Sequence, residues 1–237
     1  MNNHLLNAQN ADWPIGFIMK PRVSVINKEL IQQYQSIATA LISDCLGRHH
    51  GSIGLKDYHQ ALLHGGLCGN AVTVRLRPGD NLMLHAAILS AEEGDVIVVD
   101  GGGDVSTAVI GGLMRTTAIK KKIAGFVIDG AIRDLDEWSQ GEMPVYAKGH
   151  THRGPSKDGP GELNTPIACA GMNVNPGDLI VADADGVVCV AAEMAEALLP
   201  RCLQKSEHEE KIRQQNQAGT PDVERFLNLL KQKKCPL

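Results

Sequence analysis

Aromatic residues are scarce in this chain: Phe, Trp and Tyr make up 3% of its 237 residues. Positive charge is not in excess either, because 23 Lys and Arg stand against 27 Asp and Glu, for a formal net charge of -4. Proteins that bind nucleic acids usually present a basic face or aromatic side chains that stack on bases. The composition therefore argues against a nucleic-acid partner. We interpret the lysine-rich runs 120–122 and 231–234 as solvated helix ends.

Cysteines are few and form no pattern. No two of them make a CxxC pair, and no spacing indicates a zinc site. The six are Cys45, Cys68, Cys169, Cys189, Cys202 and Cys235. We expect most of them to be buried, inert thiols.

Long apolar runs are also missing. None approaches the ~20 residues that a helix needs to cross a bilayer. The first residues show no charged stretch followed by an apolar one, as a secretory leader would. We therefore expect a protein of the reducing cytoplasm, without a membrane partner.

Glycine, in contrast, is abundant, with 25 residues, and 43% of the chain is hydrophobic. Val/Ile-rich runs separate the glycines, so they indicate tight turns rather than disorder. The apolar content is ample for a substantial core. No internal repeat or low-complexity linker divides the chain, and we expect a single α/β domain.

Hydrophobic periodicity predicts an alternation of helices and strands. Helices are expected over residues 28–47, 81–94, 106–122 and 193–218, with Gly47 and Gly94 as stops and Pro200 as a break or restart. Strands are expected over 69–76, 95–100 and 124–129, and within 144–149, 165–171, 176–183 and 186–191. Residues 1–27 show no period and are expected to wrap the domain or to contact a neighbouring subunit.

The strands at 95–100 and 124–129 are joined by a crossover that contains a helix, so they should be parallel. In open α/β sheets, ligands bind beyond the carboxyl ends of such strands. Arg133 and Asp134 follow the second strand. The guanidinium of Arg133 could hold the oxygens of a small anion directly, while the carboxylate of Asp134 could hold a hard cation that binds the same oxygens.

A glycine pair, Gly111 and Gly112, interrupts the predicted crossover helix. Each glycine costs about 1 kcal/mol relative to alanine inside a helix, which suggests that the backbone breaks there. A helix restarting at Leu113 would direct free N–H groups at a carboxylate. Close packing of the helix on the sheet explains the pair equally well.

Several ordered motifs resemble one known family. They are GDNLMLHAAI, EEGDVIVVDGGGD, VIGGLM, AGFVIDGAIRDLDEW and RGPSKDGPGELNTPIACAGMNVNPGDLIVADADGVVCVA. Together they are similar to the RraA-like family over about residues 36–217. The resemblance implies an αββα sandwich with a swivelling β/β/α core, assembled as a homotrimer or homohexamer. It also divides the chain into an arm with the start of the first helix (1–35), a catalytic core (36–192) and a C-terminal helical segment (193–237) that completes a neighbouring subunit's site.

The aldolase branch of this family acts on 4-hydroxy-4-methyl-2-oxoglutarate and 4-carboxy-4-hydroxy-2-oxoadipate. By resemblance, Asp134 is the metal ligand, Arg133 binds substrate, and Glu209, with Glu210 as the next candidate, reaches the site from a neighbouring subunit. The backbone of Gly112, Leu113 and Met114 would hold the pyruvate carboxylate. Gly112 stands where aldolases usually have Asp or Glu, which puts the proton-transfer step in question.

The chemistry so implied is that of a class II pyruvate aldolase. A divalent cation, Mg²⁺ or Mn²⁺, would chelate a 2-oxo acid and stabilise the enolate left when the C3–C4 bond breaks. Mg²⁺ keeps several waters and needs few protein ligands, which suits a site with one obvious carboxylate. Oxaloacetate would be decarboxylated through the same enolate, and no Schiff-base lysine is required.

Other polar residues have two possible roles. His85 lies near the expected pocket but could equally be a helix histidine with satisfied hydrogen bonds. His150 and His152 form an HxH pair without a third ligand, so a second metal there is the less favoured reading. Asp183 and Asp185 are expected to shape a turn. Asp44 and Arg48 either face the pocket or form an ion pair at a helix end.

A second class of function also fits the family, because its founding member inhibits a ribonuclease by protein contact. Fold alone does not decide between enzyme and regulator. The stretch 153–162 and the C-terminal segment with Glu209 are more similar to the aldolase branch, so the aldolase is the favoured hypothesis.

Overall fold

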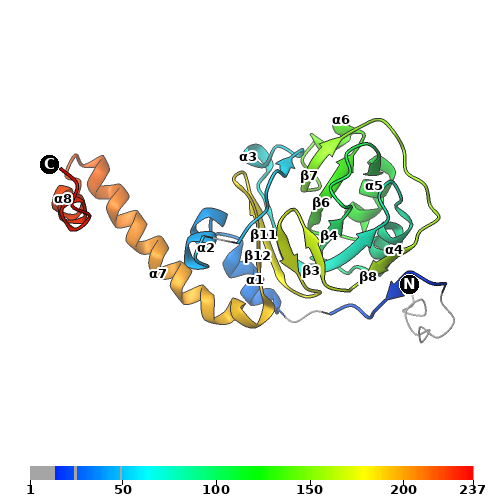
Figure 1. The fold of residues 1–237 in the computed structure, drawn as a ribbon, viewed down its shortest axis with the longest axis horizontal. Helices are drawn as coiled ribbons and strands as arrows, with labels where there is room; N and C mark the ends of the chain where they lie inside the picture. The colour runs from blue at the N-terminus through cyan, green and yellow to red at the C-terminus, as the bar shows by residue number, and fades with distance from the viewer. Residues whose placement is uncertain (1–13, 24–25, 49, 237) are drawn as a thin grey trace.

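A mixed sheet of ten strands forms the centre of the fold in the computed structural model, which describes residues 14–23, 26–48 and 50–236 (Figure 1). The strand order is β1-β8-β3-β4-β6-β7-β2; β5 pairs with β6, and β11 joins β12 to β3. A separate hairpin pairs β9 with β10. The strands are β1 (Phe17–Met19), β2 (Lys56–Asp57), β3 (Leu67–Leu76), β4 (Val96–Asp100), β5 (Ala108–Ile110), β6 (Gly125–Ile132), β7 (Val145–His150), β8 (Gly161–Leu163), β9 (Ile167–Cys169), β10 (Met172–Val174), β11 (Leu179–Asp183) and β12 (Gly186–Val190).

Strands β3, β4, β6 and β7 are parallel neighbours and form the middle of the sheet. β4 is buried from Val96 to Val99, as expected for a continuous apolar run covered on both faces. The predicted parallel pairing of β4 with β6 is confirmed, and Asp100 lies opposite Asp129 in the register.

Helices cover the molecule on two sides. They are α1 (Lys28–Tyr34), α2 (Thr39–Cys45), α3 (Ala61–His64), α4 (Leu82–Ser90), α5 (Gly112–Lys120), α6 (Leu135–Trp138), α7 (Ala192–Gln217) and α8 (Val223–Gln232). One core lies between the sheet and α4, α5 and α6; another joins α1, α2 and the start of α7 to β11 and β12. A third core fills the space between the central strands and the hairpin β9–β10 with β11. These layers agree with the predicted αββα sandwich in a single domain.

The helix predicted over 28–47 is in fact two helices, α1 and α2. Asp183, at the end of β11, accepts hydrogen bonds from Thr39 N (2.8 Å) and Thr39 Oγ1 (2.6 Å). This tertiary cap starts a new helix at Thr39, and apolar periodicity alone does not reveal such a break. Gly47, with φ of 84°, follows α2 as a stop, as expected. The segment 81–94 is helical only to Ser90, and Gly94 lies in the turn beyond it.

The helix predicted over 106–122 begins with a strand instead. Ala108, Val109 and Ile110 form β5 beside β6, and the helix α5 starts at Gly112. The backbone therefore changes at the glycine pair, as the helix-break interpretation expected.

Pro200 does not interrupt the C-terminal helix, contrary to the prediction, because α7 runs unbroken from Ala192 to Gln217. A proline inside a helix removes one hydrogen bond and costs about 3 kcal/mol. Leu198, Leu199 and Cys202 are buried on both sides of it, and this packing holds the helix together.

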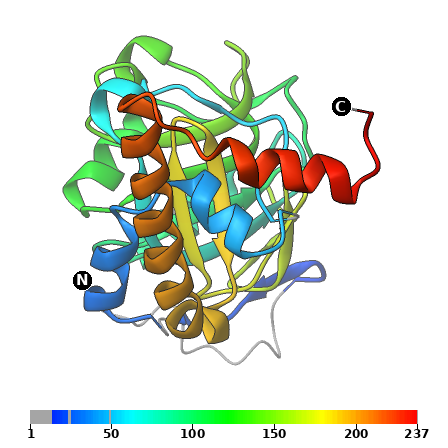
Figure 2. The ribbon, with the colours of Figure 1, turned by 90° about the vertical axis from the view of Figure 1, so that its left-hand side faces the viewer.

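The two ends of the chain behave differently. Near the N-terminus, β1 pairs with β8, and Arg22 donates hydrogen bonds to both carboxylate oxygens of the buried Asp95. This part of the chain wraps the domain as expected; residues 1–13 and 24–25 lie outside the described residues. At the other end, the later turns of α7 and all of α8 stand clear of the sandwich (Figure 1), and they face the viewer in Figure 2. No helix in the described ranges is both long and apolar enough to cross a membrane.

Candidate functional site

One pocket lies where α4, β5, α5, the end of β6 and the loop 153–158 meet. It brings together Arg133, Asp134, Leu113, Met114 and His85, whereas Gly112, which was expected beside them, is not one of its lining residues. The glycine loop 101–103 after β4 does not line it. The lining residues are Asn81, His85, Val109, Ile110, Gly111, Leu113, Met114, Arg133, Asp134, Pro155 and Lys157.

Asp134 immediately precedes α6 and has a left-handed backbone conformation, with φ of 64° and ψ of 49°. Such a conformation is uncommon outside glycine and asparagine, costs of order 1–3 kcal/mol and is found preferentially at active sites. Its Oδ2 accepts a hydrogen bond from Gly112 N at 2.8 Å and lies 3.8 Å from Arg133 Nε. The side chain remains 43% exposed, so Asp134 can bind a ligand from the pocket.

Backbone hydrogen bonds on both sides fix the position of Arg133. Its N–H donates to Ile110 O at 3.0 Å, and its carbonyl accepts from Trp138 Nε1 at 2.8 Å. Its guanidinium passes so close to Gly154 that a β-carbon there would contact Nη1. The loop 153–158 therefore lies over Arg133 and helps to direct it into the pocket.

The first turn of α5 presents its backbone to the same pocket. Gly112 N–H is taken by Asp134, and Met114 N–H donates to Gly111 O. Within the described residues, Leu113 N–H has no acceptor. Of the three residues expected to hold a carboxylate through their backbone, Leu113 has the amide available in this conformation.

Two polar side chains on α4 and its cap leave unpaired atoms at the pocket. Asn81 Nδ2 donates to Val109 O at 2.8 Å, but its buried Oδ1 has no partner in the described structure, and neither does His85 Nε2. Burial, and secondarily the charge of Lys157, lowers the pKa of His85 and so favours the neutral ring. These atoms are available to a ligand.

Asn81 and Lys157 were not predicted as site residues. Asn81 belongs to the GDN turn before α4, and Lys157 belongs to the stretch RGPSKDGPGE whose similarity to the aldolase branch was the available signal.

Asp80 anchors the loop that covers the pocket. Its carboxylate is 1% exposed and accepts from Ser156 Oγ and Asp158 N, both at 2.7 Å, and from Leu82 N at 2.9 Å. Burial alone would raise the pKa of Asp80, but these hydrogen bonds outweigh it and the pKa is lowered.

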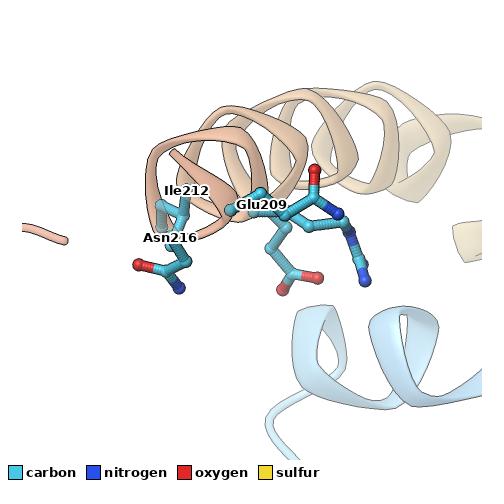
Figure 3. Close-up of a pocket in the computed structure, with 5 residues that line it drawn as sticks. Glu209, Ile212 and Asn216 are labelled. Carbon is cyan, nitrogen blue, oxygen red and sulfur yellow. The ribbon is translucent and has the colours of Figure 1, made fainter. Parts of the chain in front are cut away.

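Glu209 lies elsewhere in this chain. It is on α7, does not line the Arg133 pocket, and forms an ion pair with Lys205 at 3.0 Å. Lys205 also binds Asp44 at 3.0 Å, and Asp44 pairs with Arg48, so these two residues form the helix-end ion pair and do not line the Arg133 pocket. Figure 3 shows Glu209, Ile212 and Asn216 on one face of α7, where they line a second, shallow pocket.

The remaining polar candidates have structural contacts. His150 Nδ1 lies 3.4 Å from the Tyr58 hydroxyl, and Asp183 caps both Thr39 and the turn at Asp185. Within the described residues, no three His, Cys, Asp or Glu side chains gather to hold a metal. All six cysteines are free, and burial raises the pKa of Cys68 to about 12, in agreement with inert thiols.

Comparison with known proteins gives the same family as the motifs. Residues 39–189 match the RraA-like family, described as Aldolase/RraA. A relative from Halalkalibacterium halodurans, named "Putative 4-hydroxy-4-methyl-2-oxoglutarate aldolase", is 37% identical over 183 residues, covering 77% of this chain and 86% of the relative.

Solved structures of inhibitor proteins are similar as well. Streptomyces coelicolor RraAS2, titled an unusual member of the RNase ES inhibitor RraA family, aligns with a TM-score of 0.74 at 26% identity over 81% of this chain and 99% of that one. The RNA-processing inhibitor RraA from Thermus thermophilis aligns with a TM-score of 0.58 at 30% identity over 65% and 92%. The fold, the ordered motifs and these matches together place the chain in the RraA-like family.

Proposed function

We propose that this protein is a divalent-metal-dependent class II pyruvate aldolase that cleaves 4-hydroxy-2-oxo acids of the 4-hydroxy-4-methyl-2-oxoglutarate type and also decarboxylates oxaloacetate. The main support is the meeting of Arg133, Asp134 and the first turn of α5 in one pocket. The names of the aldolase relatives agree with a lyase.

The donor atoms of the pocket fit a hard cation. The described contacts of the Asp134 carboxylate use Oδ2, which leaves Oδ1 for a ligand. A site with one carboxylate as direct ligand and, among the described residues, no His/Cys cluster suits Mg²⁺ or Mn²⁺, which accept oxygen ligands and water. When bound by Asp134, the cation would polarise the 2-oxo acid and spread the negative charge of the enolate.

The chain's own residues would bind and orient the substrate. Leu113 N–H, at the start of α5, would bind the substrate carboxylate. The guanidinium of Arg133 would lie against the C2 oxygen and stabilise the negative charge that develops there. Asn81 Oδ1 and neutral His85 Nε2 would bind hydroxyl or water hydrogens on the α4 side, and Lys157 would attract the remote carboxylate of a diacid.

We also propose that the protein is a homo-oligomer, a trimer or hexamer, in which Glu209 of one subunit completes the site of another. In support, Glu209 does not line the Arg133 pocket of its own chain but a separate pocket formed by residues of α7. Side chains of α8 such as Phe226 and Leu229 are exposed there, as expected of a surface that a second subunit covers.

The decisive assay measures pyruvate release from 4-hydroxy-4-methyl-2-oxoglutarate, 4-carboxy-4-hydroxy-2-oxoadipate and oxaloacetate, with Mg²⁺ and after exhaustive chelation. We expect turnover that requires the cation and returns when it is added back. Because free metal ions decarboxylate oxaloacetate, an equal concentration of the Asp134→Asn variant serves as the blank. Turnover that survives chelation, or no turnover of any of these acids, would reject the proposal.

The regulator function is the second candidate, and the structural similarity to the two RraA inhibitors favours it. A regulator would bind a ribonuclease through its surface and would not need the pocket. If the assay shows no cleavage and the protein inhibits a ribonuclease E-type enzyme equally well with Arg133→Ala, this candidate replaces the aldolase.

A further inference from the structure

Gly112 lacks the acidic side chain expected at its position, but the space is not empty. A β-carbon built on Gly112 would overlap three atoms of Glu137: Oε1, Cδ and Oε2. The carboxylate of Glu137 therefore occupies the place into which a side chain at position 112 would extend. We propose that Glu137 supplies the second carboxylate of the cation site, in place of the acid that position 112 lacks; this inference rests on the proposed function.

The short helix α6 directs Glu137 to this place. It begins at Leu135, directly after Asp134, and Glu137 N donates to Asp134 O at 3.1 Å. Both carboxylates reach the first residue of α5, since Asp134 accepts a hydrogen bond from Gly112 N and Glu137 lies where a β-carbon of Gly112 would be. Trp138, which is fully buried and bonded to Arg133 O, holds α6 in this orientation, while Asp136 is exposed on the other side.

Asp134 and Glu137 thus approach Gly112 from two directions. Asp134 contacts its N–H, and Glu137 contacts its α-carbon side. Glu137 is half-buried, and within the described structure its carboxylate forms no ion pair or hydrogen bond. A carboxylate withdrawn from water without a partner is costly, and a bound cation with its waters would offset that cost.

Mg²⁺ and Mn²⁺ keep several waters when few protein groups bind them. Carboxylates beyond the direct ligands accept hydrogen bonds from those waters and fix the arrangement, and their loss typically lowers metal affinity or activity 10- to 100-fold. Glu137 is therefore a positioning residue, with Asp134 as the direct ligand. Its carboxylate enters from α6 rather than from α5, which explains why Gly112 is tolerated.

The test is Mn²⁺ binding, followed by electron paramagnetic resonance of the free ion and by calorimetry, on the full-length oligomer. Glu137→Gln should weaken Mn²⁺ binding about 10- to 100-fold. Asp136→Asn is the matched control, since it removes an exposed neighbouring charge and should bind as the parent does. The double variant Gly112→Asp with Glu137→Ala returns a carboxylate to the same space from α5 and should recover most of the affinity.

Pyruvate release by each variant should follow the same order. If Glu137→Gln binds Mn²⁺ as the parent does, the role of Glu137 is overturned. The proposed function would stand in that case, because the parent protein would still bind metal and cleave substrate. If the double variant folds but binds Mn²⁺ as weakly as Glu137→Gln, the inference is also overturned. Glu137 would then act through the stability of α6. A parent protein that binds no Mn²⁺ would overturn this inference and the proposed function together.

Discussion

Gly111 precedes α5 with a φ of −153°, an extended conformation that any residue can adopt. Glycine is required here by lack of space, because a β-carbon at this position would clash with Asp134 Oδ2 and would lie 2.9 Å from Arg133 Cγ. The close approach of the β6–α6 loop to the start of α5 therefore depends on this glycine.

Gly111→Ala should displace the Arg133–Asp134 pair and reduce turnover on the order of 100-fold, as a misplacement of about 1 Å can do. Gly130→Ala is the control, since its added carbon would have only ordinary contacts, at 3.5 Å or more. Steady-state pyruvate release and calorimetric Mg²⁺ titration of both variants measure the effect. Parent-like kinetics of Gly111→Ala would show that the site lies elsewhere.

The two charged residues of the loop should fail in different ways. Asp134→Asn keeps the shape but loses the charge that holds a hard cation, so Mg²⁺ binding and turnover should disappear together. Arg133→Lys should keep Mg²⁺ binding, but it loses the planar fork that contacts the substrate oxygens, and we expect a loss of about 100- to 1000-fold in rate. Normal Mg²⁺ binding by Asp134→Asn would contradict the assignment, as would parent-like turnover of Arg133→Lys.

Arg133 and Asp134 could be predicted from the sequence because they follow a buried parallel strand. Residues that follow parallel strands lie at the carboxyl edge of the sheet, where ligands bind. It could not predict that Glu137 fills the space at Gly112. That contact joins residues 25 positions apart in the chain and depends on how α6 packs beside α5, which apolar periodicity does not reveal. Asn81 and Lys157 were missed for a similar reason, since only the packing of α4 under the loop 153–158 brings them together.

At the scale of the elements, Asp80 ties the loop 153–158 to the start of α4. The fold lowers the pKa of Asp80 from its ordinary value of 3.8. The ionised carboxylate therefore stabilises the folded state fully at pH values above 3.8, and this stabilisation is lost as the pH falls through the lowered pKa. Hydrogen bonds to a charged group contribute about 1.5–3 kcal/mol each.

Asp80→Asn should therefore lower the free energy of unfolding by about 1.5–3 kcal/mol at pH 7, and by less at pH 3, which lies below the ordinary pKa, where protonation of the unfolded parent already removes part of this contribution. Urea denaturation at both pH values measures the difference. Because the loop covers Arg133, the variant should also raise KM for the substrate. An equal loss of stability at the two pH values would mean that the charge of Asp80 plays no part.

Element types were predicted best where one physical signal dominates. The apolar runs of β4, β6 and β11 are buried on both faces and became strands as expected. The errors arose where a partner distant in sequence decides the outcome. Asp183 starts α2 at Thr39, the edge of β6 turns 108–110 into a strand, and tertiary packing carries α7 through Pro200.

At the scale of the whole molecule, α7 and α8 form an extension that a compact monomer would not need. Glu209 pairs with Lys205 there, and Lys205 also reaches Asp44 on α2, so the first half of the extension is attached to the sandwich. The face of α8 that contains Val223, Phe226 and Leu230 is exposed. The C-terminal helix was predictable from composition, but its direction away from the sandwich was not, because that direction depends on the contacts of α2 with α7.

The shared site predicts complementation between subunits. Arg133→Ala removes the substrate-binding side of a site and Glu209→Ala removes the contribution of the neighbour, so either homo-oligomer should be inactive or nearly so. In a mixed oligomer, some sites pair a chain with intact Arg133 and a chain with intact Glu209. These sites should restore a measurable part of the parent's pyruvate release, about one site in four in a random mixture and about one in three in isolated mixed trimers. The two variants should be co-expressed with different affinity tags, and the doubly tagged oligomers isolated.

Mixing Arg133→Ala with Asp134→Asn is the control, because both changes fall on the same side of the site. If the control mixture is as active as the test mixture, Glu209 has no special role across the interface. If verified mixed oligomers of Arg133→Ala and Glu209→Ala are inactive, Glu209 lies outside the site.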